Sequence, residues 1–428
     1  MKLEDRQAWL PRLQSSMKLL LLTNLYPPQE LGGYGRSMQD FAWGLSKRGH
    51  CVSVLTSDAP YLEEDTPQLG NDSTKIKRLL KLKGSYEKGF SMITNQSVCR
   101  GIDSENNKVI FNILNEERFD GILLGNIDLL GYEIITPMLN TGIKVCHHIG
   151  FVAPPFSASL YPTHSNYHMI TASYAVRKSL VDHGLPVADA EVIYPGARCD
   201  LFGENASSRS LPEPLGHSLG CSVNPLGSKA NPLRLCFAGI FMETKGAHTV
   251  AESLIHLKKK RIHTYASFAG CSFQADYKEA IHIMLKKEGL ESQTLFAGQL
   301  TRSQLARFFN LQHVAIFPSI YPEAFGIVGA EAMASGIVLV SSGAGGAYEL
   351  IENGVSGLLF KPGSSESLSN TLEYLIRLPA DRIKAIAQAG KHRVHTSFSV
   401  QNAAKQIEEV FQATSVLNNK SNRGVITL

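Results

Sequence analysis

The sequence has no pair of cysteines in a C-x-x-C spacing, although it contains seven cysteines among its 428 residues. An odd number of cysteines without such pairs argues against a disulfide framework and against a zinc site. No apolar run reaches the roughly 18 residues that a membrane-spanning helix requires. Because cysteines outside disulfides are typical of a reducing compartment, we expect a cytoplasmic protein.

The chain also lacks a strong excess of charge and any motif of a nucleic-acid-binding domain. Its 42 lysine and arginine residues are nearly balanced by 38 acidic residues, which leaves a net charge of +4. A dedicated nucleic-acid-binding protein usually carries a larger basic excess, so we expect no nucleic-acid partner. Residues 1–16 lack the apolar core of a secretion signal, and we interpret them as an N-terminal extension.

Short apolar segments alternate with helical patterns in both halves of the chain. Residues 18–23 form a mostly apolar run that precedes a glycine-rich loop, a helical pattern and a second apolar run at residues 51–56. This succession of strand, loop, helix and strand is the unit of a parallel sheet with crossover helices. The other predicted strands are residues 121–124, 144–147, 168–171, 191–194, 233–238, 266–269, 294–297, 314–318 and 338–341.

The predicted fold class is α/β, with two Rossmann-like doubly wound parallel-sheet domains. Residues 17–202 form the first domain and residues 233–397 form the second. Residues 203–232 are rich in Ser, Pro, Gly and Asn, and they form a linker or insertion. Residues 398–417 are helical with one apolar face. Because ligands bind beyond the carboxyl ends of parallel strands, two such domains leave a binding cleft between those ends.

The segment 317–360 places two glutamates around the start of a predicted helix. A buried strand is followed by a loop that carries Glu323, and the helix begins near Ile327. The N–H groups at the start of a helix have no partners within it, and the helix dipole is positive there, which suits a phosphate. Glu331 lies one turn into the helix, on the same face as Ile327. The glycine-rich turn 343–346 is a second place that suits an anion.

This segment resembles glycosyltransferase family 4. In the frame P-S-x-x-P-E-A-F-G-x-x-x-x-E-A-M-A-x-G, two glutamates are separated by seven residues, as in the E-x7-E signature of that family. The resemblance extends to the G-G-x-x-E-L-I pattern that begins at Gly345, to Lys245 with the glycine after it, to Pro195 with the glycine after it, and to Ser173. It covers nearly the whole chain and is stronger in the second half.

The resemblance implies the GT-B fold, in which the two Rossmann-like domains face an interdomain cleft. The second domain then binds the donor, and the helix at residues 398–417 crosses back onto the first domain. The implied activity is that of a retaining glycosyltransferase, which transfers a hexose-type sugar from a nucleotide-diphosphate sugar. A UDP-sugar is the expected donor, with a GDP-sugar or an ADP-sugar as alternatives. The expected acceptor is a growing polysaccharide, a lipid-linked glycan or a small sugar.

No metal ion and no cofactor are expected, because family members need no metal and the sequence has no D-x-D pattern. The nucleotide sugar is a co-substrate. In the implied reaction, the acceptor attacks the face from which the nucleotide diphosphate leaves, and the leaving phosphate helps to take up the acceptor's proton. No protein nucleophile is then required.

The resemblance also assigns roles to individual residues. The catalytic residues are Glu323, which grips the donor sugar, Lys245, which pairs with the diphosphate, and His148, for which His147 is the alternative. Glu331 accepts hydrogen bonds from the donor ribose, and the backbone around Gln299 and Leu300 recognises the base. The complete donor-binding set is Ala324, Phe325, Gly326, Ile327, Glu331, Gln299, Leu300, Gly345 and Gly346. The acceptor or phosphate loop is Gly32, Gly33, Tyr34 and Gly35.

One position departs from the family pattern. The family usually has an arginine in the motif G-R-x-x-x-x-K-G, whereas this chain has Ile240 ahead of Lys245. An arginine offers a planar fork of donors to a diphosphate, and an isoleucine offers no polar group. Arg198 is our candidate for a compensating cation. The departure also motivates two alternatives: a catalytically weak or inactive GT-B protein that binds nucleotide sugars, and a GT-B epimerase or phosphorylase.

The candidate residues also have purely structural interpretations. Glu323 and Glu331 would then be surface carboxylates near a helix start, Lys245 would be a solvated lysine, and His148 would be a satisfied histidine at a strand end. Ser173 is expected to cap the helix that follows it rather than to contact a ligand.

A basic stretch alternates with apolar residues near the end of the first hundred residues. Its cations are Lys75, Lys77, Arg78, Lys81 and Lys83. One interpretation is peripheral contact with the anionic inner face of a membrane, which would suit a lipid-linked acceptor. The other interpretation is a charged surface helix without a ligand.

Overall fold

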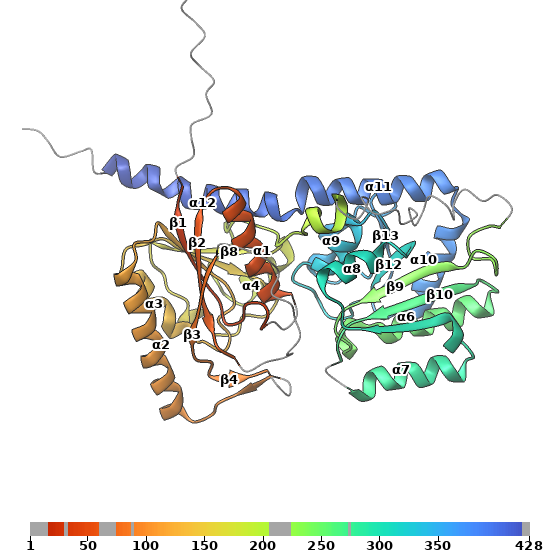
Figure 1. The fold of residues 1–428 in the computed structure, drawn as a ribbon, viewed down its shortest axis with the longest axis horizontal. Helices are drawn as coiled ribbons and strands as arrows, with labels where there is room; N and C mark the ends of the chain where they lie inside the picture. The colour runs from red at the N-terminus through yellow and green to blue at the C-terminus, as the bar shows by residue number, and fades with distance from the viewer. Residues whose placement is uncertain are drawn as a thin grey trace, which may run out of the picture.

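A computed structural model describes residues 16–29, 33–59, 74–86, 90–204, 224–272 and 275–421. Most of the predicted extension 1–16, part of the predicted linker 203–232, and Gly32 lie outside these described residues. The ribbon shows two α/β domains beside each other, with the last two helices running along one side of both (Figure 1).

The first domain is built on six parallel strands in the order β3-β2-β1-β6-β7-β8. They are β1 (Lys18–Leu22), β2 (Cys51–Ser57), β3 (Lys75–Leu80), β6 (Gly121–Leu124), β7 (Val145–Ile149) and β8 (Tyr167–Thr171). Every residue of β6 and β7 is buried. Such continuously apolar strands are expected where helices cover both faces of a parallel sheet.

Helices cover both faces of this sheet, and β1 shows how they divide it. Leu19 and Leu21 lie in one core with α1 and α12, whereas Leu20 and Leu22 lie in the opposite core with α2, α3 and α4. Successive strand residues point to opposite faces, so one strand serves both cores. The helices are α1 (Tyr34–Lys47), α2 (Gln96–Glu116), α3 (Ile135–Leu139), α4 (Tyr174–Asp182) and α12 (Val400–Ser421). The short strand β4 (Gly84–Ser85) pairs antiparallel with β5 (Ser91–Met92).

The second domain repeats the arrangement, with parallel strands in the order β11-β10-β9-β12-β13-β14. They are β9 (Leu233–Ala238), β10 (Thr264–Ala269), β11 (Thr294–Gly298), β12 (Val314–Phe317), β13 (Val338–Ser341) and β14 (Leu358–Leu359). The helices are α6 (Ala247–Lys259), α7 (Ala275–Lys287), α8 (Arg302–Phe309), α9 (Ile327–Ala334), α10 (Ser365–Arg377) and α11 (Ala380–Ser397). Helices α6, α7 and α10 pack on one face, and α8 and α9 pack on the other.

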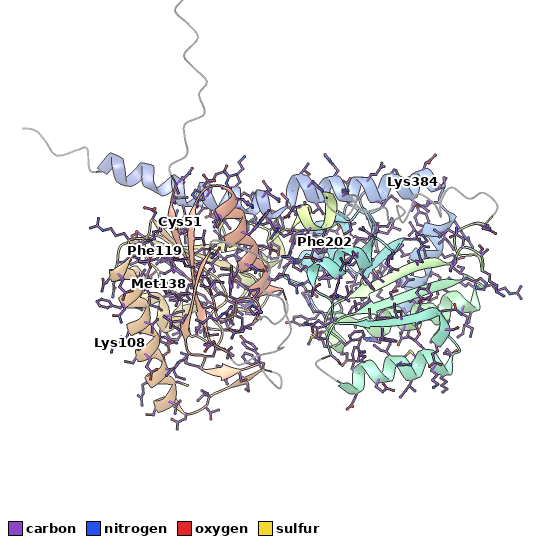
Figure 2. All side chains as sticks on the ribbon, viewed as in Figure 1. Cys51, Lys108, Phe119, Met138, Phe202 and Lys384 are labelled. Atoms are coloured by element: carbon purple, nitrogen blue, oxygen red, sulfur yellow. The ribbon has the colours of Figure 1, made fainter. Side chains whose placement is uncertain are left out.

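The interior of each domain is filled by large apolar side chains. Phe119 and Met138 lie inside the first domain, Phe202 lies among the helices of the second, and Lys108 projects from the outer surface (Figure 2). Phe202 packs on Phe309 of α8, with 6.2 Å between the ring centroids. The chain has therefore reached the second domain by residue 202.

The last helix returns to the first domain. Ala404 and Phe411 of α12 are buried in one core with Phe41 of α1. A Cβ atom built on Gly44 of α1 would lie only 2.7 Å from the Cβ of Ala404. The absence of a side chain at residue 44 therefore allows α1 and α12 to pack closely, and this contact joins the end of the chain to its beginning.

Two sequence predictions about local structure were wrong. Residues 191–194 do not form a strand of the sheet, since only Val192 makes an isolated bridge, to Thr171. The basic stretch is not a helix, because residues 75–80 form β3 at the edge of the sheet. Its charges suit an edge strand, because charged side chains discourage pairing with another chain.

Four of the five cations in this stretch are held by other groups of the chain. Lys77 lies 3.5 Å from Glu117, Lys81 pairs with Glu105, and Lys83 lies 2.8 Å from Asp103 and 2.9 Å from Glu133. Arg78 donates to the carbonyl groups of Tyr26 and Pro27 and to the side chain of Gln29. Within the described residues, no helix combines the length and apolar character that a bilayer crossing requires.

Candidate active site

A cavity of about 790 Å³ lies between the two domains. Its walls include Gly150 after β7 and Gly239, Gly270 and Pro318 after β9, β10 and β12. These residues follow the carboxyl ends of parallel strands in both sheets, where ligands of such folds bind.

Most of the predicted site residues line this cavity. The structure brings together Gly33, Tyr34, His148, Lys245, Gln299, Leu300, Glu323, Ala324, Phe325, Gly326 and Ile327. The predicted residues within the described part of the chain that are not among the lining residues are Gly35, Glu331, Gly345 and Gly346.

Lys245 and Glu323 meet at the wall that the second domain provides. The Lys245 Nζ atom lies 2.6 Å from Glu323 Oε1, and the Ser319 hydroxyl group donates to the same oxygen. Lys245 ends a 3₁₀ turn after β9, and Gly246 follows it in a left-handed conformation with φ of 72°. A Cβ atom at residue 246 would lie 2.1 Å from the carbonyl oxygen of Pro318. Only a glycine allows this close approach, which places the lysine beside the loop that carries the glutamate.

The start of α9 opens into the same cavity. Gly326 precedes the helix with φ of 106°, and no side chain caps the helix start. Ile327 and Val328, the first two residues of α9, line the cavity. Backbone N–H groups in the first turn of a helix have no intrahelical partners, and the dipole is positive at this end. This helix start therefore suits a phosphate group.

Gly345 and Gly346 support the Glu323 loop from behind. The Glu323 N–H group donates to the carbonyl of Ala344 at 3.1 Å, and the Gly346 N–H group donates to the carbonyl of Glu323 at 2.7 Å. Cβ atoms at residues 345 and 346 would lie 2.5 Å and 2.2 Å from the carbonyl oxygens of Glu323 and Ala324. The two glycines thus allow the backbone contact that fixes the position of Glu323.

Glu331 lies behind the cavity in a buried cluster of charges. Its side chain is 0% exposed, and its Oε1 atom accepts a hydrogen bond of 3.0 Å from Arg302. Its Oε2 atom has no hydrogen-bond partner. Arg302 also donates two hydrogen bonds, of 2.6 and 2.9 Å, to Asp40 of α1. Burial raises the pKa of Glu331, while Arg302 and Arg36 act in the opposite direction.

The structure separates the two histidines at the end of β7. His147 lies in the core, where its ring nitrogens contact the Tyr167 hydroxyl at 2.6 Å and the Gly125 carbonyl at 3.1 Å. His148 lines the cavity, and its Nε2–H group donates to the Ile193 carbonyl at 2.9 Å while Nδ1 has no partner. Burial lowers the pKa of His148 to about 4, so its imidazole is neutral at pH 7 and Nδ1 is a hydrogen-bond acceptor.

The comparisons with known proteins agree with this geometry. Residues 223–393 match the family model of glycosyl transferases group 1. The chain is a glycosyltransferase, and the segment that matches the group 1 model lies in its C-terminal half. It is similar to glycogen synthase of Mycobacterium tuberculosis, with 22% identity over 423 residues that cover 93% of this chain and 95% of the relative.

The solved structures that resemble this glycosyltransferase establish its GT-B fold. A glycosyltransferase from Rickettsia africae superposes with a TM-score of 0.73 at 19% identity, over 93% of this chain and 98% of the other. Anabaena HepE in complex with UDP-glucose superposes with a TM-score of 0.67 at 20% identity, over 93% of this chain and 100% of the other. The fold class predicted from the sequence is thus confirmed.

The prediction that Arg198 compensates for Ile240 was wrong for this glycosyltransferase. Ile240 lines the cavity, but Arg198 is not among the lining residues. The Arg198 guanidinium makes two hydrogen bonds of 2.8 Å to Asp200 and lies over the Trp43 ring, 3.5 Å from its centroid. Arg198 is therefore already paired with Asp200 and packed on Trp43 of α1.

Three residues of this region were not predicted from the sequence. Arg302 and Asp40 form the buried cluster with Glu331, and Arg36 lines the cavity from the first turn of α1. Arg302 follows Thr301, which caps α8, and the sequence around it has no motif. The signal available for Arg36 was its position directly after the glycine loop 32–35.

Proposed function

We propose that this glycosyltransferase is a retaining, metal-independent enzyme of family 4 that transfers a hexose-type sugar from a UDP-sugar to a carbohydrate acceptor. The observation that carries the proposal is the pairing of Lys245 with Glu323 beside the open start of α9, in one cavity between two domains. A cationic amine and free helical N–H groups suit a diphosphate, and a carboxylate suits the hydroxyl groups of a sugar. The complex of the structurally similar HepE protein with UDP-glucose supports the choice of a UDP-sugar.

Donor binding would exchange the partners of Lys245. In the structure the amine is paired with Glu323 at 2.6 Å. A diphosphate at the start of α9 would attract the amine and leave Glu323 to accept hydrogen bonds from the sugar hydroxyl groups. His148 lines the opposite wall, and its buried Nδ1 atom has no partner among the described residues, so a sugar hydroxyl group that reached it would satisfy a second acceptor. The Oε2 atom of Glu331 has no partner, so a ribose hydroxyl group that reached it would satisfy a buried acceptor.

The proposed transfer step would use these positions. The bond between the anomeric carbon and the phosphate oxygen breaks, and the nucleotide diphosphate leaves with the electron pair. The acceptor oxygen bonds to the anomeric carbon on the same face, and its proton passes to the leaving phosphate. Lys245 and the start of α9 stabilise the charge that develops on the phosphate, and loss of one such donor typically lowers kcat by about 100- to 1,000-fold.

The acceptor would enter from the side of the first domain. The name of the relative glycogen synthase supports a polysaccharide acceptor. A lipid-linked glycan and a small sugar stay alternatives. Peripheral membrane contact also stays a prediction, but the pairing of Lys77, Lys81 and Lys83 with acidic side chains reduces the charge that such contact would use. We also propose a cytoplasmic location, since no disulfide bond joins the six cysteines within the described residues.

The proposal is tested by incubating the protein with several UDP-sugars and glycan acceptors in the presence of EDTA. We expect turnover, a product with the anomeric configuration of the donor, and a loss of at least about 100-fold in kcat for Glu323→Ala and Lys245→Ala. Lys178→Ala is the control, because Lys178 is an exposed residue of α4. Turnover that Glu323→Ala leaves intact would overturn the proposed site.

Ile240 favours one alternative, a catalytically weak protein that binds nucleotide sugars. The cavity wall has an isoleucine where the family pattern has an arginine. On this alternative, calorimetry would detect UDP binding, while no donor and acceptor pair would give turnover.

A further inference from the structure

The cavity has a second cation, and it comes from the opposite domain. Among the residues that line the cavity, all within the described part of the chain, the arginine and lysine residues are Arg36 and Lys245. We propose that Arg36 binds the donor diphosphate from the side of the first domain and so supplies the cation that Ile240 does not. This inference rests on the proposed function, because it takes the ligand to be a nucleotide-diphosphate sugar.

The position of α1 brings Arg36 to the phosphate site. Gly33 precedes α1, and a Cβ atom built on it would lie 3.0 Å from Cδ1 of Ile327, the first residue of α9. The starts of these two helices therefore meet at the cavity. No side chain caps the start of α1, so its first-turn N–H groups, like those of α9, are directed towards the same space. Arg36 lies in this first turn.

The face of α1 that carries Arg36 is turned towards the second domain. Gly33, Arg36, Ser37 and Asp40 follow the i, i+3, i+4, i+7 spacing of one helical face. Asp40 contacts Arg302 of α8 at 2.6 Å, and this contact fixes which way the face points. Gly33, Arg36 and Ser37 all line the cavity. Arg36 thus lies one turn nearer the cavity than the buried contact between the domains.

Electrostatics agrees with this placement. The positive charge of Arg36 lowers the pKa of Glu331 in α9, which opposes the effect of burial. The charge of Arg36 is therefore felt on the helix whose start is the phosphate site. A guanidinium group offers paired N–H donors that match two phosphate oxygens. The isoleucine at residue 240 has no polar group, and the single amine of Lys245 cannot provide this paired geometry.

A cation from the first domain has a different consequence from one in the second. If both cations were in the second domain, that domain alone could hold the diphosphate. With Lys245 on one wall and Arg36 on the other, the complete phosphate site exists only when both domains face the same ligand. Donor affinity would then depend on the relative position of the domains.

The test is calorimetric titration of the full-length chain with UDP and with uridine. We expect Arg36→Gln to weaken UDP binding by about 10- to 100-fold, as expected for loss of a charge-assisted hydrogen bond. Uridine binding should be unchanged, because uridine has no phosphate. Arg36→Lys should give an intermediate affinity, since it keeps the charge without the fork.

A second variant distinguishes a loss of phosphate binding from a folding defect. Ile240→Arg restores the family arginine on the opposite wall, and in the Arg36→Gln background it should recover most of the lost affinity for UDP. Lys47→Gln is the matched control, because Lys47 is an exposed cation in the last turn of the same helix. It should bind UDP as the wild type does.

The outcomes separate the two proposals. Wild-type UDP affinity in Arg36→Gln, together with weakened binding in Lys245→Ala, would refute the role of Arg36 and keep the proposed function. Equal losses of UDP and uridine affinity in Arg36→Gln would also refute it, because the effect would not be specific to phosphate. If the wild-type protein bound neither UDP nor any UDP-sugar, the proposed function itself would fail.

Discussion

Replacing Arg302 by glutamine should destabilise the whole molecule, because this arginine compensates two buried carboxylates at once. The side chains of Asp40, Arg302 and Glu331 are 2%, 5% and 0% exposed. Burial alone would lower the pKa of Arg302, but the two carboxylates raise it, so the guanidinium stays charged. Without it, Glu331 would lose the donor to its Oε1 atom, and Asp40 would keep, within the described residues, only Arg198, whose guanidinium lies 3.7 Å away.

The size of the effect follows from the burial. Removing one partner of a buried ion pair costs about 3–5 kcal/mol, because the remaining charge is left uncompensated. For units of 150–250 residues, each kcal/mol lowers Tm by roughly 2–4 °C. We therefore expect Arg302→Gln to lower the first thermal transition by roughly 6–20 °C, as measured by scanning calorimetry at pH 7.5.

Two comparisons show whether charge is the cause. Lys178→Gln removes the cation of an exposed pair with Asp182, whose side chains are 79% and 59% exposed, and it should leave the transition unchanged. The triple variant Asp40→Asn, Arg302→Gln, Glu331→Gln carries no uncompensated charge and should be more stable than Arg302→Gln alone. The reasoning from buried charge is refuted if Arg302→Gln has the same transition temperature as the Lys178→Gln control. It is also refuted if the triple variant is no more stable than Arg302→Gln.

Three further changes should have effects of known sign. Burial lowers the pKa of His147 to about 3, so on acidification the unfolded chain takes up a proton that the native chain does not. The free energy of unfolding, measured in urea, should therefore fall as the pH drops below about 6.5, by up to about 1.4 kcal/mol per pH unit. The variant His147→Gln should show a smaller dependence on pH. Gly346→Ala should displace the Glu323 loop and lower kcat/KM by at least about 10-fold, whereas Gly101→Ala, where a Cβ meets nothing within 4 Å, should leave kcat/KM unchanged. Gly44→Val should separate α1 from α12 and destabilise the fold by about 1–3 kcal/mol, as read from chemical denaturation; an unchanged midpoint would contradict the packing argument.

The sheets were predictable because their strands are short apolar runs covered on both faces. The apolar pattern did not predict the structure correctly in segments that are not buried on both faces. Residues 75–80 (KIKRLL) mix charged and apolar side chains without strict alternation, so their pattern does not separate an edge strand from a charged helix. Residues 191–194 lie beside β8, where only Val192 makes a bridge.

The cavity residues divide in the same way. Lys245 and Glu323 belong to local motifs, and their contact at 2.6 Å joins two segments of one domain. The partner of Glu331 was not predictable, because Arg302 carries no motif and its contact with Asp40 spans 262 positions and two domains. A single sequence gives no sign of such a pairing, since it arises only when the two sheets have been placed against each other.

Polar groups make contacts between the two domains. Besides the Asp40–Arg302 pair, Glu349 of the second domain accepts hydrogen bonds of 3.1 and 2.8 Å from the N–H groups of Tyr174 and Ala175, at the start of α4 in the first domain. Both contacts are polar, and polar interdomain contacts permit relative movement more readily than a large apolar interface does.

Lys245, Arg36 and the starts of α1 and α9 place positive charge on both walls of one cavity. Such walls repel each other unless an anion lies between them. Glu323 is paired with Lys245, and Glu331 lies within the electrostatic reach of Arg36, so each cation has a carboxylate on the second domain. A nucleotide diphosphate would attract both walls and take the place of Glu323 beside Lys245, whereas Glu331 is buried and bonded to Arg302. On this argument, Glu323 balances the charge of Lys245 and becomes available to the sugar only when the phosphates arrive, which couples donor recognition to assembly of the site.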